Sequence, residues 1–285
     1  MEPEWVDPEW SWPCRWVDVP GGRLRTVDVG SGPTVLFAHG TPTWSYEWRH
    51  LLTALAPTHR CIAPDHLGFG RSERPTGADY SPEAHAARFR ALAEALDLRD
   101  VTLVVHDFGG PIGLPLALGT DRVARVVIVN TWMWPLDDDP GMAWGARLIG
   151  SPVGRWLYGW ANLSLRVIAP SAYGDRAKLT LAIHAQYLAP FTDRAARTEV
   201  LWPLARALLG SSAHYASLWD RRARLAALPT TLVWGLADSA FPPRFLARWR
   251  EALPQAAVTA IEGAGHWPHE EEPERVIAAI RAALA

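Results

Sequence analysis

The 285-residue chain is poor in cysteine and almost without lysine. Its two cysteines, Cys14 and Cys61, are too few for a disulfide framework and do not have a metal-type spacing. Lys178 is the single lysine, so nearly every basic residue is an arginine. No apolar run reaches the length of a membrane span, and residues 1–10 carry acids and prolines where a signal peptide needs an uninterrupted apolar region. These absences predict a cytoplasmic protein with no membrane partner.

The chain also lacks an excess of charge of either sign. Its formal net charge of −2 provides no basic surface for nucleic acid or for an anionic membrane. An apolar content of 49% is ordinary for a globular protein of this length, which can bury a substantial core. Neither nucleic acid nor an obligatory protein partner is therefore expected.

Strand and helix patterns alternate along most of the chain. Short apolar runs bounded by turn residues predict strands, whereas the spacing in SPEAHAARFRALAEALDL (81–98) predicts an amphipathic helix with Ser81 as N-cap. Such alternation is typical of a mostly parallel sheet with helices on both faces. The predicted strands are residues 14–19, 23–29, 33–40, 60–68, 101–107, 122–130, 229–235 and 257–263.

A helical segment interrupts this pattern. Between residues 131 and 219 helical stretches broken by proline and glycine dominate, with no convincing strand. The pattern predicts an α/β core formed by residues 1–130 and 220–285, with an inserted helical cap at 131–219.

Reactive side chains follow several of the predicted strands. In open α/β sheets ligands bind at the carboxyl ends of the strands. Asp107 follows one strand, Asp238 in WGLADSAF follows another, and His266 in EGAGHWPHEEE follows the last. Two carboxylates and a histidine from three distant segments are therefore expected to converge.

The turn at Asp107 resembles a nucleophile elbow, in which the nucleophile sits between a strand and a glycine-opened helix. The sequence VVHDFGGPIG (104–113) has aspartate at the central position, and no G-x-S-x-G motif occurs in the chain. An N-cap aspartate would look the same in isolation. The order nucleophile, acid, histidine formed with Asp238 and His266 favours the nucleophile.

These motifs together resemble an α/β-hydrolase of the haloalkane dehalogenase and epoxide hydrolase branch. The resemblance implies that Asp107 attacks an electrophilic carbon to form an alkyl-enzyme ester. It implies that His266, oriented by Asp238, activates the water that hydrolyses the ester, with the N–H groups of Thr41 and Phe108 as oxyanion hole. The matching stretches are HGTPTWSYEWR (39–49), APDHLGFGRSERP (63–75), VVHDFGGPIG (104–113), VNTWMWP (129–135), WGLADSAF (234–241) and GAGHWPHEEEPE (263–274).

The leaving group is less clearly encoded. Dehalogenases of this branch usually hold the halide with a tryptophan after the nucleophile and an asparagine after His-Gly, where this chain has Phe108 and Thr41. The Thr41 hydroxyl can donate to a halide. Trp132 and Trp134 are candidate substitute donors for substrate or halide, although both could equally serve as packing. Hydrolytic dehalogenation of a small apolar haloalkane is the favoured prediction.

Three alternatives stay open. Epoxide opening would need acidic hydroxyls, and the cap supplies Tyr158, Tyr173, Tyr187 and Tyr215. Opening of a strained lactone would use the same nucleophile. A non-catalytic relative that binds an apolar ligand would have lost part of the triad, which this chain retains.

No metal or cofactor is expected. His266 and His269 are followed by three glutamates, but Pro268 interrupts the helix that metal-ligand spacing would require. No nucleotide motif opens a helix after a strand. Water is therefore the expected second substrate.

Overall fold

A computed structural model describes residues 6–7 and 10–285. Its centre is an eight-stranded sheet in the order β1-β2-β4-β3-β5-β6-β7-β8. The pairs β1–β2 and β2–β4 are antiparallel, and every other neighbouring pair is parallel, which confirms the mostly parallel sheet. The strands are β1 (Cys14–Val19), β2 (Gly22–Val29), β3 (Thr34–Ala38), β4 (Arg60–Pro64), β5 (Val101–His106), β6 (Val123–Val129), β7 (Thr230–Gly235) and β8 (Ala257–Ile261).

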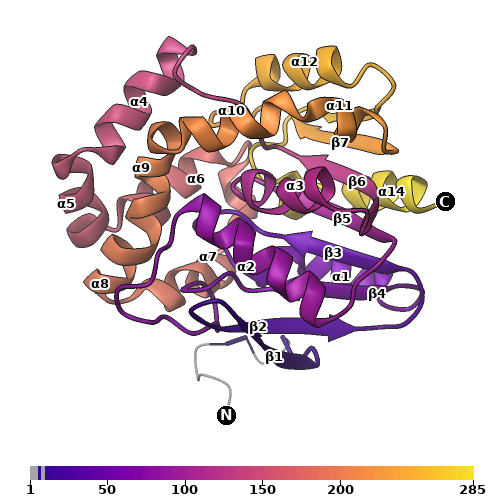
Figure 1. Cartoon of the computed structure of the whole chain (residues 1–285). Helices are drawn as coiled ribbons and strands as arrows, with labels where there is room; N and C mark the ends of the chain where they lie inside the picture. Colours follow the sequence, from indigo (N-terminus) through magenta and orange to yellow (C-terminus); the bar gives the residue numbers. More distant parts are fainter. Residues whose placement is uncertain (1–5, 8–9) are drawn as a thin grey trace.

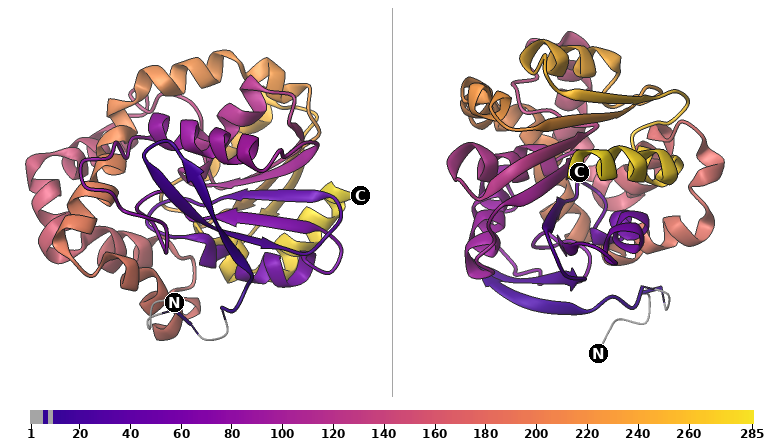
Figure 2. Two further views of the ribbon diagram at one scale, coloured as in Figure 1. Left: turned by 60° about the horizontal axis from the view of Figure 1, so that its bottom comes forward. Right: turned by 90° about the vertical axis from the view of Figure 1, so that its right-hand side faces the viewer.

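Helices cover both faces of the sheet. In Figure 1, α2 (Pro82–Ala95) and α3 (Gly109–Gly119) lie in front of the strands, and α1 (Arg49–Leu55) and α14 (Pro273–Leu284) lie behind them. Two further views show the same layers around the twisted sheet (Figure 2). The side chain of Ser81 accepts from the N–H of Ala84 at 3.2 Å, so α2 begins with the expected cap.

The strand predicted at 60–68 is shorter than expected. β4 ends at Pro64, and the chain then turns, because the buried carboxylate of Asp65 organises a loop. This carboxylate accepts from the N–H of Ser45 at 3.0 Å and from the N–H of Arg71 at 2.9 Å. Hydrogen bonds of this kind replace the ladder that a longer strand would have formed.

Every regular element between β6 and β7, a stretch described throughout, is helical. Most of these helices gather at one end of the sheet, at the left of Figure 1. The last two pack against α3, so they lead the chain back to the sheet. The main helices are α4 (Pro140–Gly150), α5 (Pro152–Ala161), a π-helix (Ser164–Ile168), α6 (Ala169–Ala172), α7 (Leu181–Leu188), α8 (Arg194–Ala196), a second π-helix (Arg197–Leu201), α9 (Trp202–Gly210), α10 (Ser212–Asp220) and α11 (Arg222–Ala226).

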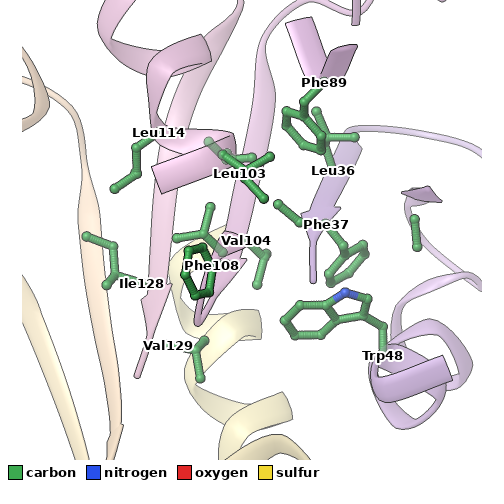
Figure 3. Packing of buried hydrophobic residues seen from close by; sticks show 14 of the residues in the cluster. Leu36, Phe37, Trp48, Phe89, Leu103, Val104, Phe108, Leu114, Ile128 and Val129 are labelled. Carbon is green, nitrogen blue, oxygen red and sulfur yellow. The ribbon is translucent and has the colours of Figure 1, made fainter. Parts of the chain in front are cut away.

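The core of the sheet supports the edge where the reactive residues lie. β5 is buried along its whole length, and Figure 3 shows Val104 of β5 near Phe108 and Val129. The rings of Phe37 and Trp48 pack 5.2 Å apart between β3 and the following helical turn. Among the described residues no helix has both the length and the hydropathy needed to cross a bilayer.

Candidate active site

Asp107 lies on the tight turn between β5 and α3, with a φ of 51°. This left-handed conformation is strained for a residue other than glycine and is maintained by close packing around the turn. A Cβ on Gly109 would lie 2.0 Å from the carbonyl oxygen of Ala38, and one on Gly110 would lie 2.0 Å from Oγ1 of Thr131. The turn therefore needs both glycines, as the sequence predicted for an elbow.

The Asp107 carboxylate has a different partner at each oxygen. Oδ1 accepts from the backbone N–H of Thr41 at 2.8 Å. Oδ2 lies 3.3 Å from Nε2 of His266. The residue is 6% exposed, so the charge is held almost entirely by protein groups. The structure thus brings together the three expected residues Asp107, Thr41 and His266.

Asp238 completes a chain of three groups. Its Oδ2 accepts from Nδ1 of His266 at 2.8 Å, and its Oδ1 accepts from the N–H groups of Ala240 at 2.7 Å and Phe241 at 3.0 Å. Burial raises the pKa of Asp238, but the charge and hydrogen bond of His266 outweigh it and hold the pKa below its ordinary value. Asp238 is therefore a fixed anion behind the imidazole.

Sequence reasoning missed Asn130, at the end of β6. Its Nδ2 donates to Oδ2 of Asp238 at 2.7 Å, and its Oδ1 accepts from the N–H of Gly235 at 2.9 Å. Asn130 has a φ of 30°, so the backbone turns sharply to aim the amide at Asp238. The signal that could have revealed it was its place after a buried strand, the same rule that pointed to Asp107.

The electrostatics of His266 favour its charged form. Burial alone would lower its pKa, but the Asp238 and Asp107 carboxylates outweigh burial and raise the pKa of His266 to about 10. At neutral pH the imidazole is therefore protonated, between two anions. Loss of either negative charge would lower this pKa.

An apolar cavity of about 250 Å³ opens in front of Asp107 and His266. The core contributes Thr41, Phe108, Phe241 and Trp267, and the helical segment contributes small and aliphatic side chains. Pockets for small molecules typically combine such an apolar wall with few polar groups. The lining residues from the helical segment are Gly141, Met142, Gly145, Ala146, Ile149, Tyr158, Ser164, Ile168, Ala169, Ala172, Ala205 and Leu208.

Trp132 and Trp134 are not among the described residues that line this cavity. Trp132 is fully buried, with its ring 4.9 Å from those of both Phe108 and Phe241. Trp134 packs 5.0 Å from Trp219. Trp132 therefore supports the cavity wall from behind, Trp134 packs away from the cavity, and the geometry does not favour direct contact of either indole with a substrate.

Of the four tyrosines that the sequence offered in the helical segment, one reaches the cavity. Tyr158 lines it and shares a hydrogen bond with Ser164, and burial together with the charge of Asp107 raises its pKa. Tyr173 and Tyr187 donate to the buried Glu270, and Tyr215 donates to the carbonyl of Ala207. A pair of tyrosine acids facing the nucleophile, as epoxide opening would use, is therefore not formed by these side chains.

Two polar atoms at the cavity have no partner among the described residues. One is Oγ1 of Thr41, and the other is the indole N–H of Trp267. Both atoms are buried and belong to residues that line the cavity, so a ligand that accepted from either would replace no existing hydrogen bond. Sequence reasoning missed Trp267, because its position after His266 does not show that its indole N–H lacks a partner.

A second buried cluster lies beside His266. The ligand atoms of Glu47, His106 and His269 lie within 4.8 Å of one another, which is a separation that a metal site could have. Oε1 of Glu47, Nδ1 of His106 and both ring nitrogens of His269 have no hydrogen-bond partner among the described residues. Oε1 of Glu47 lies 3.4 Å from Nδ1 of His106, and Nε2 of His106 donates to the carbonyl of His266 at 2.8 Å. His106 therefore holds the backbone that carries the imidazole.

Comparisons with known proteins agree with this geometry. A model of the α/β-hydrolase fold family matches residues 33–273. The chain therefore belongs to the α/β-hydrolase family.

Similar proteins indicate the branch of the α/β-hydrolase family to which the chain belongs. Haloalkane dehalogenase 2 of Mycobacterium tuberculosis is 35% identical over 269 residues, covering 93% of each chain. A cis-3-alkyl-4-alkyloxetan-2-one decarboxylase of Xanthomonas campestris pv. campestris is 34% identical and covers 97% of each chain. The crystal structure of haloalkane dehalogenase DbeA from Bradyrhizobium elkani superimposes with a TM-score of 0.83 at 28% identity, covering 95% of this chain and 99% of that one. Within the family, the chain is an enzyme of the haloalkane dehalogenase-like branch of hydrolases.

Proposed function

We propose that the chain hydrolyses small apolar electrophiles through a covalent ester of Asp107, with haloalkanes as the favoured substrates. One observation carries this proposal. The Asp107 carboxylate faces an apolar cavity, with the Thr41 N–H at one oxygen and the His266 imidazole at the other. A carboxylate needs no base to become a nucleophile, so the histidine is free for a later step.

In the first step, one carboxylate oxygen of Asp107 attacks the carbon that bears the halogen. The new C–O bond forms as the carbon–halogen bond breaks, and the halide leaves as an anion without a proton. The apolar cavity contributes by excluding water, which would otherwise solvate the carboxylate and weaken it as a nucleophile. The helical segment 131–219 acts as the cap that completes this wall.

In the second step, His266 takes a proton from water, and the oxygen attacks the carbonyl carbon of the Asp107 ester. Negative charge then develops on the former Oδ1, where the Thr41 N–H already donates at 2.8 Å. The N–H of Phe108, the first residue after the nucleophile, is the proposed second donor. Collapse of the intermediate breaks the bond to the alkyl oxygen, which takes the proton of the new carboxyl group. The alcohol leaves, Asp107 is again a carboxylate, and His266 keeps the proton that it took from water.

The electrostatic interaction between Asp107 and His266 determines when the histidine can act as a base. Esterification removes the negative charge of Asp107, which is one of the two charges that raise the pKa of His266 to about 10. The pKa of the imidazole therefore falls only after the first step. The histidine then loses its proton and becomes a base when a base is needed.

Thr41 and Trp267 are the proposed donors to the departing halide. Phe108 has no N–H on its ring, and neither Trp132 nor Trp134 lines the cavity. The unpartnered hydroxyl of Thr41 and indole N–H of Trp267 are the available polar hydrogens. A charged acceptor makes each such hydrogen bond stronger than a neutral one would be.

Opening of a four-membered lactone is the second candidate. It is favoured by the 34% identity to a cis-3-alkyl-4-alkyloxetan-2-one decarboxylase and by the hydroxyls of Thr41 and Tyr158 at the cavity. Attack of Asp107 on the alkyl carbon of the ring oxygen would break that C–O bond and leave a carboxylate. Hydroxyl donors suit such an oxygen anion.

Mass spectrometry of the His266→Gln variant tests the function and separates these substrates. Without the base, the second step stalls and the ester on Asp107 accumulates. A bromoalkane should add the mass of its alkyl group and release bromide, whereas a lactone should add its whole mass. The matched control is the Asp107→Asn, His266→Gln double variant, which should add nothing.

The outcome also decides between an enzyme and a binding protein. The panel consists of bromoalkanes, chloroalkanes, epoxides and dialkyl lactones. The proposed function is wrong if no member forms an adduct with His266→Gln and wild type turns none of them over. If a bromoalkane bound without reacting, the chain would be a receptor for apolar ligands.

A further inference from the structure

Exposed large apolar side chains are concentrated on the helical segment. Seven of the nine such side chains among the described residues lie between residues 144 and 181. A contiguous stretch of chain that exposes this much apolar area usually marks an interaction surface. These residues are Trp144 (69% exposed), Leu148 (46%), Val153 (60%), Trp156 (57%), Trp160 (61%), Val167 (54%) and Leu181 (91%).

Helical spacing puts the exposed side chains in rows. Val153, Trp156 and Trp160 on α5 are three and four residues apart, so they share one face of that helix. Trp144 and Leu148 on α4 are four residues apart and share a face in the same way. α4 and α5 are consecutive helices at the outer edge of the molecule (Figure 1). We call the exposed residues of α4 and α5 the cap surface.

The helix that carries Trp144 and Leu148 also forms part of the cavity wall. Gly141, Met142, Gly145, Ala146 and Ile149 of α4 line the cavity. Tyr158 of α5 lines it as well. The cap surface and the cavity are therefore opposite sides of the same thin layer of helices.

The charge of this segment differs from that of the whole chain. Residues 140–172 contain three arginines, Arg147, Arg155 and Arg166, and no aspartate or glutamate, although the net charge of the chain is −2. A further arginine, Arg194, lies 4.6 Å over the ring of Trp160. Exposed tryptophans next to arginines are typical of a surface that enters the headgroup region of a membrane.

We propose that the cap surface docks onto an anionic lipid bilayer, from which apolar substrates reach the cavity. Tryptophan and aliphatic side chains would enter the headgroup–acyl boundary while the arginines pair with lipid phosphates. Pairing of two copies through this surface is less favourable, because a symmetric contact would bring the same arginines face to face. The use of the surface for substrate supply rests on the proposed function, but the docking itself does not.

The net charge had suggested no membrane partner, and the local distribution is what changes that expectation. Residues 140–172 are basic and acid-free although the total is balanced, because the nearest acids, Asp137, Asp138 and Asp139, stand just before α4 and the others lie outside this range. At physiological salt, attraction between protein charges and lipid headgroups extends over roughly 8 Å, the Debye length. The charge of the nearby segment therefore governs the approach to a membrane.

Vesicle co-sedimentation of the full chain tests the proposal. Wild type should sediment with vesicles of phosphatidylglycerol and phosphatidylcholine, and less with phosphatidylcholine alone. The Trp144→Gln, Trp156→Gln variant should lose about tenfold or more in partitioning, because it removes two apolar anchors. Arg147→Gln should lose about fivefold on the anionic vesicles only.

Trp16 provides a matched control. It is 44% exposed on the edge strand β1 and lies 5.1 Å from the guanidinium of Arg23, so it is also a tryptophan beside an arginine. Trp16→Gln should sediment like wild type. Circular dichroism melts of each variant verify folding, and the assay contains no substrate, so its result is independent of the chemistry at Asp107.

Three outcomes would overturn the proposal. Wild type could stay in the supernatant with anionic vesicles, or the double tryptophan variant could sediment as well as wild type. The third is a wild-type dimer on size exclusion that the double variant converts to monomer, which would make the cap surface a contact between two copies.

Discussion

Nε2 of His266 lies 3.3 Å from Oδ2 of Asp107, while its Nδ1 pairs at 2.8 Å with Asp238. The imidazole is therefore placed between a carboxylate that the proposed reaction consumes and one that it leaves unchanged. In the proposed reaction only the first of these charges changes, so the protonation of His266 would follow the state of Asp107.

This relationship predicts the titration of an Asp107→Asn variant. The amide is neutral, as the ester would be, so the pKa of His266 should fall from about 10 by roughly 1–3 pH units. In the wild-type ester the same fall would make hydrolysis faster as pH rises through the lowered pKa of His266, because only the neutral imidazole accepts a proton. NMR of the imidazole resonances measures the pKa directly. Asp18→Asn, which changes an exposed carboxylate on β1, is the control and should leave it unchanged.

A second prediction concerns Asn130, which donates to Asp238 and would act on the proposed reaction through that carboxylate. Asn130→Ala should slow hydrolysis of the ester by about 10- to 100-fold and alkylation much less, because the lost hydrogen bond orients the acid behind His266. Pre-steady-state measurement of bromide release and of alcohol release separates the two steps. Equal slowing of both would mean that Asn130 acts on the fold and has no specific effect on the base.

The sequence was sufficient for much of this architecture. The alternating pattern predicted the sheet because strands buried on both faces leave short apolar runs that few other structures produce. Asp107 directly follows β5, and Asp238 and His266 lie in the loops after β7 and β8. They could be located because the carboxyl ends of parallel strands meet at one edge.

The residues that the sequence did not reveal depend on side-chain packing. Whether Trp132 faced the cavity or the core could not be decided from its position, since the answer depends on Phe108 and Phe241, which fill the space around it. Trp267 was missed for the converse reason. Its indole N–H has no partner among the described residues, and a missing partner can be recognised only once the neighbours are placed.

A third prediction concerns the position after the nucleophile. Phe108→Trp adds an indole N–H at the cavity and should strengthen bromide binding by about tenfold, the effect of one added hydrogen bond to an anion. Because Phe108 packs 4.9 Å from Trp132, the larger ring should also cost about 1–3 kcal/mol of stability. Halide titration monitored by thermal shift measures the first effect, and urea unfolding measures the second.

Phe108→Leu is the control for that experiment, since it changes the shape of the side chain without adding a donor. It should leave bromide binding no stronger than in wild type. If Phe108→Leu strengthened binding as much as Phe108→Trp, cavity shape and not the N–H would control the halide.

The last prediction concerns the largely buried pair between Arg49 and Glu270, two core residues that meet two tyrosines of the helical segment. Nη1 of Arg49 lies 2.5 Å from Oε1 of Glu270, and the same carboxylate accepts from the hydroxyls of Tyr173 and Tyr187. Burial would lower the pKa of Arg49, but the Glu270 charge outweighs it and raises that pKa, so the arginine stays charged. Glu270→Ala would leave this charge unpaired and should lower the free energy of unfolding by about 3–5 kcal/mol.

Glu94→Ala is the matched control for Glu270→Ala. Glu94 pairs with Arg90 at 2.8 Å on the exposed face of α2, where water screens the charges, so its loss should cost only about 0.3–0.5 kcal/mol. Urea unfolding of both variants measures the two costs on one scale. If the Glu270 variant were no less stable than the Glu94 variant, water would have to solvate Arg49 in the folded state. The contact between core and cap would then be far looser than the buried pair and its two tyrosines indicate.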